Sequence, residues 1–343
     1  MRVLKLEKKN TEKLYDVLSK FGEVWSPVKE DESYTYQKID KAADLTFHHH
    51  PSRTILPEKK LLMPPKFTTL NFSSKGYEKP EEEISSKVVF GVHSCGVHAF
   101  NILDKFYTTD YIDADYKIRR EKLIIVATSC LPDEYCFCNK TVTSIVQEGF
   151  DLALIDLEDY YLVWIGTSIG DDIVRVGQRI GIFNENVPKD VTEKYSKYRK
   201  DKREAFINDI DLEGITDLME LSHDADFWKE LGDKCLACGQ CTMVCPTCTC
   251  YNIIEDNALN EDAGTRERYW DSCMFKDFSL TAGDHNFRAA KSERLKLWYT
   301  HKLKAFIGHF GSPSCVGCGR CIVTCPVDIN VRTVAEKLKK GAE

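Results

Sequence analysis

Hydrophobic residues follow two different spacings in the first half of the chain, and each spacing predicts a different element. In residues 11–21, apolar side chains recur every three to four positions, which predicts a short amphipathic helix. Two continuous apolar runs, 87–92 and 122–127, are typical of strands that are buried on both faces of a parallel sheet. The segment 96–107 between them has a helical pattern, so the three segments together predict a β-α-β unit.

Two further short strands are expected at 151–157 and 160–165, joined by a tight turn. Residues 22–86 mix Pro, Lys and Ser with apolar residues and predict no definite element. The fold class expected for the first half is therefore α/β, or α+β, with a small sheet that contains parallel strands. We place this N-terminal domain at residues 1–187.

The pattern becomes helical and highly charged in the second half. Helical spacing of apolar residues covers much of 188–232, then 288–308, and a short helix is expected at 331–340. These segments predict a second, mainly α-helical domain over 188–343, which begins with a helical bridge.

One cysteine pattern occurs twice in this second domain. The run C-x2-C-x2-C-x3-C-P begins at Cys235 and returns 80 residues later at Cys315. Bacterial-type ferredoxins use this spacing to hold two [4Fe-4S] clusters, and the fourth cysteine of each run ligates the other cluster. We therefore predict one cluster on Cys235, Cys238, Cys241 and Cys325, and a second on Cys315, Cys318, Cys321 and Cys245.

Zinc is the alternative metal for these motifs, because C-x2-C pairs also suit tetrahedral zinc sites. Each run has three closely spaced cysteines followed by a fourth, and two such runs supply eight thiolates, which favours iron–sulfur clusters instead. The segment 246–314 between the motifs is far longer than the connection in a minimal ferredoxin. We therefore expect an α-helical dicluster domain rather than the small β-hairpin ferredoxin fold.

A second group of cysteines lies in the first domain, just after the two buried strands. Its members are Cys95, Cys130, Cys136 and Cys138. Because ligand sites in parallel sheets gather beyond the carboxyl ends of the strands, Cys95 and Cys130 should converge in space. The sequence thus predicts a third [4Fe-4S] cluster, with buried free thiols as the alternative. His93 and His98 flank Cys95 and are expected to support this site rather than to ligate iron.

Three cysteines remain after these assignments, namely Cys248, Cys250 and Cys273. They are one thiolate short of a full set, so a fourth cluster would need His285 or a residue of another chain. Packing near the predicted clusters is the simpler interpretation.

Composition and missing motifs narrow the function further. The net charge of −7 argues against a basic surface that binds nucleic acid. No apolar run reaches the length of a membrane span. The charged N-terminus lacks the apolar stretch of a signal peptide, so we expect a cytoplasmic protein whose cysteines ligate metal. The chain has no G-x-G-x-x-G segment after a strand and no P-loop, so neither flavin nor nicotinamide is expected on it.

Several long segments resemble one known family over nearly the whole chain. They include FGVHSC (90–95), SCLPDEYCFCN (129–139), CPTCTCY (245–251) and RERYWDSCMF (266–275). The sequence is similar to the iron–sulfur β subunit of soluble sulfhydrogenases, which are nickel–iron hydrogenases, and to the related iron–sulfur subunit of anaerobic sulfite reductase. The resemblance implies a hetero-oligomer with a flavin subunit that exchanges electrons with NAD(P)H. It also implies a catalytic partner, either a nickel–iron hydrogenase or a sirohaem reductase.

The function expected from these observations is electron relay without catalysis on this chain. Twelve cysteines form three ligand sets, and no catalytic grouping of side chains accompanies them. Electrons would pass between the flavin-containing partner and the catalytic partner, most simply a hydrogenase. The alternatives are a role as the iron–sulfur subunit of anaerobic sulfite reductase, or direct reduction of a sulfur substrate at the N-terminal cluster.

Overall fold

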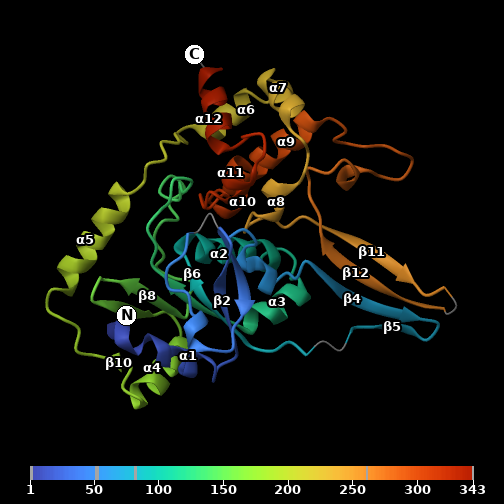
Figure 1. The fold of residues 1–343 in the computed structure, drawn as a ribbon. Coiled ribbons are helices and arrows are strands. Elements are labelled where there is room, and N and C mark those ends of the chain that lie inside the picture. The colour runs from blue at the N-terminus through green and yellow to red at the C-terminus, as the bar shows by residue number, and fades with distance from the viewer. Residues whose placement is uncertain (1–2, 51–53, 81–82, 260–261, 342–343) are drawn as a thin grey trace.

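An eight-stranded mixed sheet lies at the centre of the first half of the chain (Figure 1). The computed structural model describes residues 3–50, 54–80, 83–259 and 262–341. The sheet has the order β10-β1-β9-β8-β7-β6-β2-β3, and the neighbours β2, β6, β7 and β8 are parallel. Its strands are β1 (Val3–Glu7), β2 (Glu23–Glu30), β3 (Ser33–Lys38), β6 (Lys87–Val92), β7 (Leu123–Thr128), β8 (Leu152–Asp156), β9 (Tyr160–Ile165) and β10 (Phe183–Asn184).

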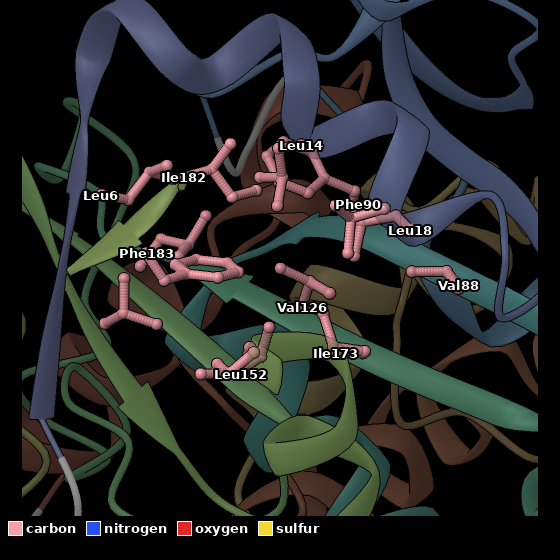
Figure 2. Close-up of a cluster of buried hydrophobic side chains, with 14 of the residues drawn as sticks. Leu6, Leu14, Leu18, Val88, Phe90, Val126, Leu152, Ile173, Ile182 and Phe183 are labelled. Atoms are coloured by element: carbon pink, nitrogen blue, oxygen red, sulfur yellow. The ribbon is translucent and has the colours of Figure 1, made fainter. Parts of the chain in front are cut away.

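Helices cover both faces of this sheet, which explains its continuous apolar strands. The covering helices are α1 (Thr11–Leu18), α2 (Ser94–Thr108), α3 (Ala114–Glu121) and α4 (Ser168–Arg179). Val88 and Phe90 of β6 pack with Leu14 of α1 and Ile173 of α4 in one buried cluster (Figure 2). Val89, which points to the opposite face, belongs to a separate cluster with side chains of α2 and α3. Both faces of these strands are buried, so polar and apolar residues do not alternate along them.

The predicted elements of the first half are confirmed, but the sheet is larger than expected. The strands expected at 87–92, 122–127, 151–157 and 160–165 are β6, β7, β8 and β9, and the helix expected at 96–107 lies within α2. β2 and β3 come from residues 22–86, for which the sequence predicted no element. β3 is an edge strand that pairs only with β2 in this sheet, so its residues SYTYQK need no apolar run.

A second sheet, with the order β11-β12-β4-β5, projects from the body as an arm (Figure 1). Its strands are β4 (Lys66–Ser73), β5 (Gly76–Glu78), β11 (Tyr251–Asn257) and β12 (Ala263–Trp270). The first two come from the first half of the chain, and the last two come from the long segment between the ferredoxin motifs. Every residue of β11 is exposed, which is why this strand carries no apolar pattern.

The second half is otherwise helical, as predicted. Its helices are α5 (Val191–Glu204), α6 (Ile215–Leu221), α7 (Phe227–Lys234), α8 (Gln240–Met243), α9 (Lys291–Thr300), the π-helical turn η6 (His301–Ala305), α10 (Phe306–Phe310), α11 (Arg320–Thr324) and α12 (Val331–Lys340). Short 3-10 turns are η1 (Lys8–Asn10), η2 (Ala42–Asp44), η4 (Glu58–Leu61) and η5 (Asp277–Ser279). Trp298 of α9 and Leu338 of α12 pack in a core that also contains cysteines.

Buried polar contacts fix the second half against the first. The Arg268 guanidinium of β12 pairs with Asp113 at 2.5 Å, and the Trp270 Nε1–H donates to the Met63 carbonyl at 2.9 Å. These contacts hold the base of the arm next to α3 and therefore position the segments that carry the cysteines.

Candidate iron–sulfur sites

The two ferredoxin motifs adopt the same backbone conformation. Ala237 and Gly317, the equivalent residues two positions after the first cysteine, have φ of 53° and 60°. Gly239 and Gly319, four positions after it, have φ of 77° and 78° and immediately precede α8 and α11. These left-handed turns fold each run of cysteines back on itself, as wrapping a cluster requires.

The first set comprises Cys235, Cys238, Cys241 and Cys325, and these four side chains line one cavity together with Trp298. Burial raises the pKa of the Cys241 thiol, and the nearby sulfurs of Cys235, Cys238 and Cys325 add to this effect. The Cys241 thiol therefore favours its protonated form without metal, and iron must displace this proton when it binds. Soft thiolates are the ligands that iron–sulfur clusters require, so the donor set fits the predicted group.

Backbone amides point at the sulfurs of this set. The Ala237 N–H donates to Cys235 Sγ at 3.3 Å, and the Ile329 N–H donates to Cys325 Sγ at 3.2 Å. Such bonds stabilise negative charge on sulfur, and hydrogen bonds to sulfur are among the factors that set cluster potentials.

The second set comprises Cys315, Cys318, Cys321 and Cys245. Burial raises the pKa of Cys321, and the sulfurs of Cys315, Cys318 and Cys245 raise it further. Cys325 in turn lines the cavity of the first set, which fits the exchange of fourth ligands that the ferredoxin spacing predicts.

A buried lysine faces this second set. Lys302 Nζ donates to Thr247 Oγ1 at 3.0 Å, and Thr247 Oγ1 lies 3.3 Å from Cys245 Sγ. Burial disfavours the ammonium charge, yet the sulfurs of Cys245, Cys248 and Cys315 outweigh this and raise the pKa of Lys302. A fully buried cation of this kind needs an anion, and a thiolate-bound cluster supplies one.

The third set comprises Cys95, Cys130, Cys136 and Cys138, at the carboxyl ends of β6 and β7. Cys95 lies in the first turn of α2 directly after β6, and Cys130 follows β7. Burial raises the pKa of Cys95, with further contributions from Cys318, Cys138 and Cys130. Cys95 and Cys138 pack in one buried cluster, an arrangement that fits the convergence expected at these strand ends.

The loop that carries Cys136 is held by local hydrogen bonds, and a lysine of α5 reaches the same site. Asp133 Oδ1 accepts from the N–H groups of Tyr135 and Cys136 at 3.0 and 3.1 Å. Lys202 is buried and its Nζ donates to Cys130 Sγ at 3.5 Å. Burial opposes the charge of Lys202, but the Cys130 sulfur raises its pKa, so the ammonium complements an anionic group here.

The second and third sets adjoin each other through close backbone contacts. The Phe137 N–H donates to the Gly317 carbonyl at 2.9 Å, and Thr143 Oγ1 donates to the Val316 carbonyl at 2.7 Å. A Cβ on Gly317 would lie 2.6 Å from the Cys138 backbone, so only glycine fits at this position. The two loops therefore pack directly against each other.

Arg320 lies buried between these two sets. Its Nε–H donates to the Thr54 carbonyl at 2.6 Å, and its Nη2 donates to Glu58 Oε1 at 3.1 Å. Its Nη1 has no hydrogen-bond partner among the described residues. Burial opposes the charge of this guanidinium, but Glu58, Cys318 and Cys95 raise its pKa. An unpartnered buried donor beside two sulfurs fits an anionic cluster on either side.

The histidines near Cys95 make contacts with protein groups. A ring nitrogen of His98, Nε2, lies 2.8 Å from the Ile145 carbonyl. His93 is buried and stacks on His49 with ring centroids 3.9 Å apart. The sequence signalled neither this stacking nor the burial of Lys202 and Lys302, since Lys202 sits in a helix rich in exposed charge. Arg320 carried a weak signal, because Gln240 occupies the equivalent position of the first motif.

A cavity of about 470 Å³ opens beside the third set. Cys130 and Tyr198 line it, together with Lys194, Lys197 and Asp156. Lys194 and Lys197 pair with Asp159 and Glu158 at 2.8 Å, so the rim is charged but balanced. The third set thus reaches the surface at this cavity, whereas the first set reaches it at Cys238, which is exposed. Within the described residues, each helix is too short or too polar to cross a bilayer.

Three comparisons relate this chain to known proteins. The 4Fe-4S dicluster domain family matches residues 234–329, which span both ferredoxin motifs. A chain of the solved F420-reducing nickel–iron hydrogenase complex from Methanosarcina barkeri aligns with 60% of this chain, with 13% sequence identity. That match covers 90% of the solved chain with a TM-score of 0.34, which is too low to indicate a shared fold. The sulfhydrogenase 2 subunit beta of Pyrococcus furiosus is 34% identical over 99% of both chains. This chain therefore belongs to the family of sulfhydrogenase β subunits and carries a 4Fe-4S dicluster domain.

Proposed function

We propose that this chain is the electron-relay subunit of a soluble nickel–iron hydrogenase complex and that it holds three [4Fe-4S] clusters. Cluster I is assigned to Cys235, Cys238, Cys241 and Cys325; cluster II to Cys315, Cys318, Cys321 and Cys245; and cluster III to Cys95, Cys130, Cys136 and Cys138. The sulfhydrogenase relative supports a hydrogenase partner over a sirohaem reductase.

The observation that carries the proposal is that the three sets form a continuous series. Cys321 of cluster II and Cys241 of cluster I pack against the same buried core. Cys318 of cluster II packs in one buried cluster with Cys95 and Cys138 of cluster III. Electrons can therefore move along the order III, II, I without leaving the protein interior.

The two ends of this series support two different partners. Cluster I reaches the surface at exposed Cys238, next to Leu236, which is 62% exposed. Cluster III reaches it at Cys130 beside the cavity of about 470 Å³. Since a hydride donor needs a flavin to divide its electron pair, one partner is a flavin subunit that exchanges electrons with NAD(P)H, and the other is the hydrogenase catalytic subunit.

Direct reduction of a small sulfur compound at cluster III is a second candidate activity, favoured by the cavity beside Cys130. A lone subunit that oxidises reduced viologen with sulfite, polysulfide or a disulfide would support this activity. A lone subunit that is inert towards all three acceptors but active in the complex would support relay alone.

Metal analysis tests the cluster assignment. Anaerobically prepared protein should contain about twelve iron and twelve sulfide per chain, because each cubane holds four of each. Replacing Cys136 with alanine should remove one cluster and leave about eight iron, whereas Cys248→Ala should keep about twelve. A wild-type content near eight iron, unchanged in Cys136→Ala, would overturn cluster III.

A further inference from the structure

One indole N–H is buried without a hydrogen-bond partner at the wall of the first cysteine set. Trp298 of α9 is 3% exposed, and its Nε1 makes no hydrogen bond to any of the described residues. Buried indole N–H groups nearly always find an acceptor, because leaving a buried donor unpaired costs folding free energy. The Trp298 N–H therefore requires an acceptor that the described polypeptide does not supply.

One face of α9 meets the cavity of the first set. Leu295, Trp298 and Tyr299 are three and four residues apart, so they lie on the same side of the helix, and all three line this cavity with the four cysteines. The remaining side chains of the wall are apolar except for Gln240, which is exposed. Sulfur is therefore the acceptor that the interior of this cavity is built to hold.

Polar contacts fix α9 to the first ferredoxin motif and so fix the position of Trp298. Lys291 Nζ, in the first turn of α9, donates to the Cys235 carbonyl at 2.6 Å. Arg294 is buried, and its Nε–H donates to the carbonyl of Met274 at 2.9 Å. Met274 itself lines the cavity. The indole ring is therefore held beside the first set by contacts on both sides of the helix.

Neutral donors surround the first set, whereas buried cations lie beside the other two. Buried Lys302 lies next to the second set, and buried Lys202 donates to Cys130 Sγ of the third. Among the described residues that line the cavity of the first set, none is lysine or arginine. Its sulfurs instead accept from the backbone N–H groups of Ala237 and Ile329. A third neutral N–H donor fits this pattern.

We infer that the Trp298 Nε1–H donates a hydrogen bond to a sulfur of cluster I and thereby raises the reduction potential of this cluster. The inference rests on the proposed function, because cluster I supplies the acceptor. A reduced cluster carries more negative charge on sulfur than an oxidised one, so the hydrogen bond stabilises the reduced form more. Trp298 thus helps to set how readily the end of the series at exposed Cys238 takes up an electron.

Potentiometric titration of the full-length, cluster-loaded protein, followed by electron paramagnetic resonance, tests this inference. Trp298→Phe keeps an aromatic ring and removes the N–H. Trp228→Phe is the matched control, because Trp228 is buried in the same core but does not line the cavity, and its Nε1–H donates to the Ser222 carbonyl at 3.0 Å. The signal of cluster I is the one that Cys238→Ala removes.

The two tryptophan variants should behave differently. At a fixed potential, the ratio of reduced to oxidised cluster I should fall about tenfold in Trp298→Phe, which is a shift of about 59 mV to lower potential for one electron. Trp228→Phe should titrate like the wild type. An unchanged ratio in Trp298→Phe would overturn the inference. Equal shifts in the two variants would also overturn it, because altered packing of the core would then explain both.

A second measurement does not depend on how well Trp298→Phe folds. Wild-type protein labelled with nitrogen-15 at the indole nitrogen of its tryptophans should show a hyperfine coupling between this nucleus and reduced cluster I in pulsed electron paramagnetic resonance. Trp228→Phe should retain the coupling, and Trp298→Phe should lose it. Wild-type protein without the coupling, or a coupling that persists in Trp298→Phe, would overturn the inference.

Failure of the proposed function gives a different result. Wild-type protein that contains no iron, or in which Cys238→Ala removes no signal, would count against cluster I itself. About twelve iron in the wild type and in both tryptophan variants, with equal potentials in all three, would count against the role of Trp298 alone. The two failures are therefore distinguishable.

Discussion

The charge of Lys302 should raise the reduction potential of cluster II. Its Nζ lies 3.0 Å from Thr247 Oγ1, which in turn lies 3.3 Å from Cys245 Sγ. The distance from Lys302 Nζ to Cys245 Sγ therefore cannot exceed the sum of these two distances. It is fully buried, so solvent screens it little. Because an added electron makes the cluster more negative, the nearby cation stabilises the reduced form.

The size of this effect follows from Coulomb's law. For one electron spread over a cluster about 8 Å from the ammonium, an effective dielectric constant of about 20 gives roughly 2 kcal/mol. For a one-electron couple this corresponds to on the order of 90 mV, since a tenfold change in the equilibrium is about 59 mV. Lys302→Met keeps most of the side-chain volume and removes the charge, so it should lower the potential of cluster II by about this amount.

Potentiometric titration followed by electron paramagnetic resonance measures the change. Lys304→Met is the matched control, because Lys304 lies on the same helical turn but is partly exposed and pairs with Glu220. Lys302→Met should shift one cluster potential strongly and the others less, and the control should leave all of them near the wild-type values. Equal shifts in the two variants, or no shift in either, would refute the electrostatic role of Lys302.

Three further predictions follow from the same contacts. Lys202→Met removes the ammonium 3.5 Å from Cys130 Sγ and should lower the potential of cluster III; an unchanged titration curve would contradict this. An alanine at Gly283, where φ is positive but no atom is close, should cost ~1 kcal/mol of stability. Gly317→Ala should cost more, because its Cβ would also meet the Cys138 backbone. Equal denaturation midpoints for the two variants would contradict this. Removing iron with a chelator should expose the second half to trypsin before the first, because the core around α1 and α4 contains no cysteine; simultaneous cleavage of both halves would count against this.

Elements with strong local patterns could be predicted from the sequence. The apolar runs of β6 and β7 and the amphipathic α12 were found at nearly their observed bounds. The cysteine sets followed from spacing within each ferredoxin motif and from the strand-end rule for Cys95 and Cys130. Both kinds of inference depend on residues that are close in sequence or on a general property of parallel sheets.

Features that depend on contacts between distant segments could not be predicted. The arm pairs β4 with β12 across almost 200 residues, and β11 is exposed on every residue, so no apolar pattern marks it. Lys302 lies in a helical segment rich in lysine, and nothing local in the sequence distinguishes it from the partly exposed Lys304.

Time-resolved electron paramagnetic resonance on the assembled complex tests the relay most directly. After oxidised complex is mixed with hydrogen and frozen at intervals, the proposed clusters of this chain should give signals before the flavin of the proposed partner subunit is reduced. In Cys138→Ala, which removes a proposed ligand of cluster III, the hydrogenase should still react with hydrogen while the flavin stays oxidised. Flavin reduction at the wild-type rate in this variant would contradict a relay through this chain.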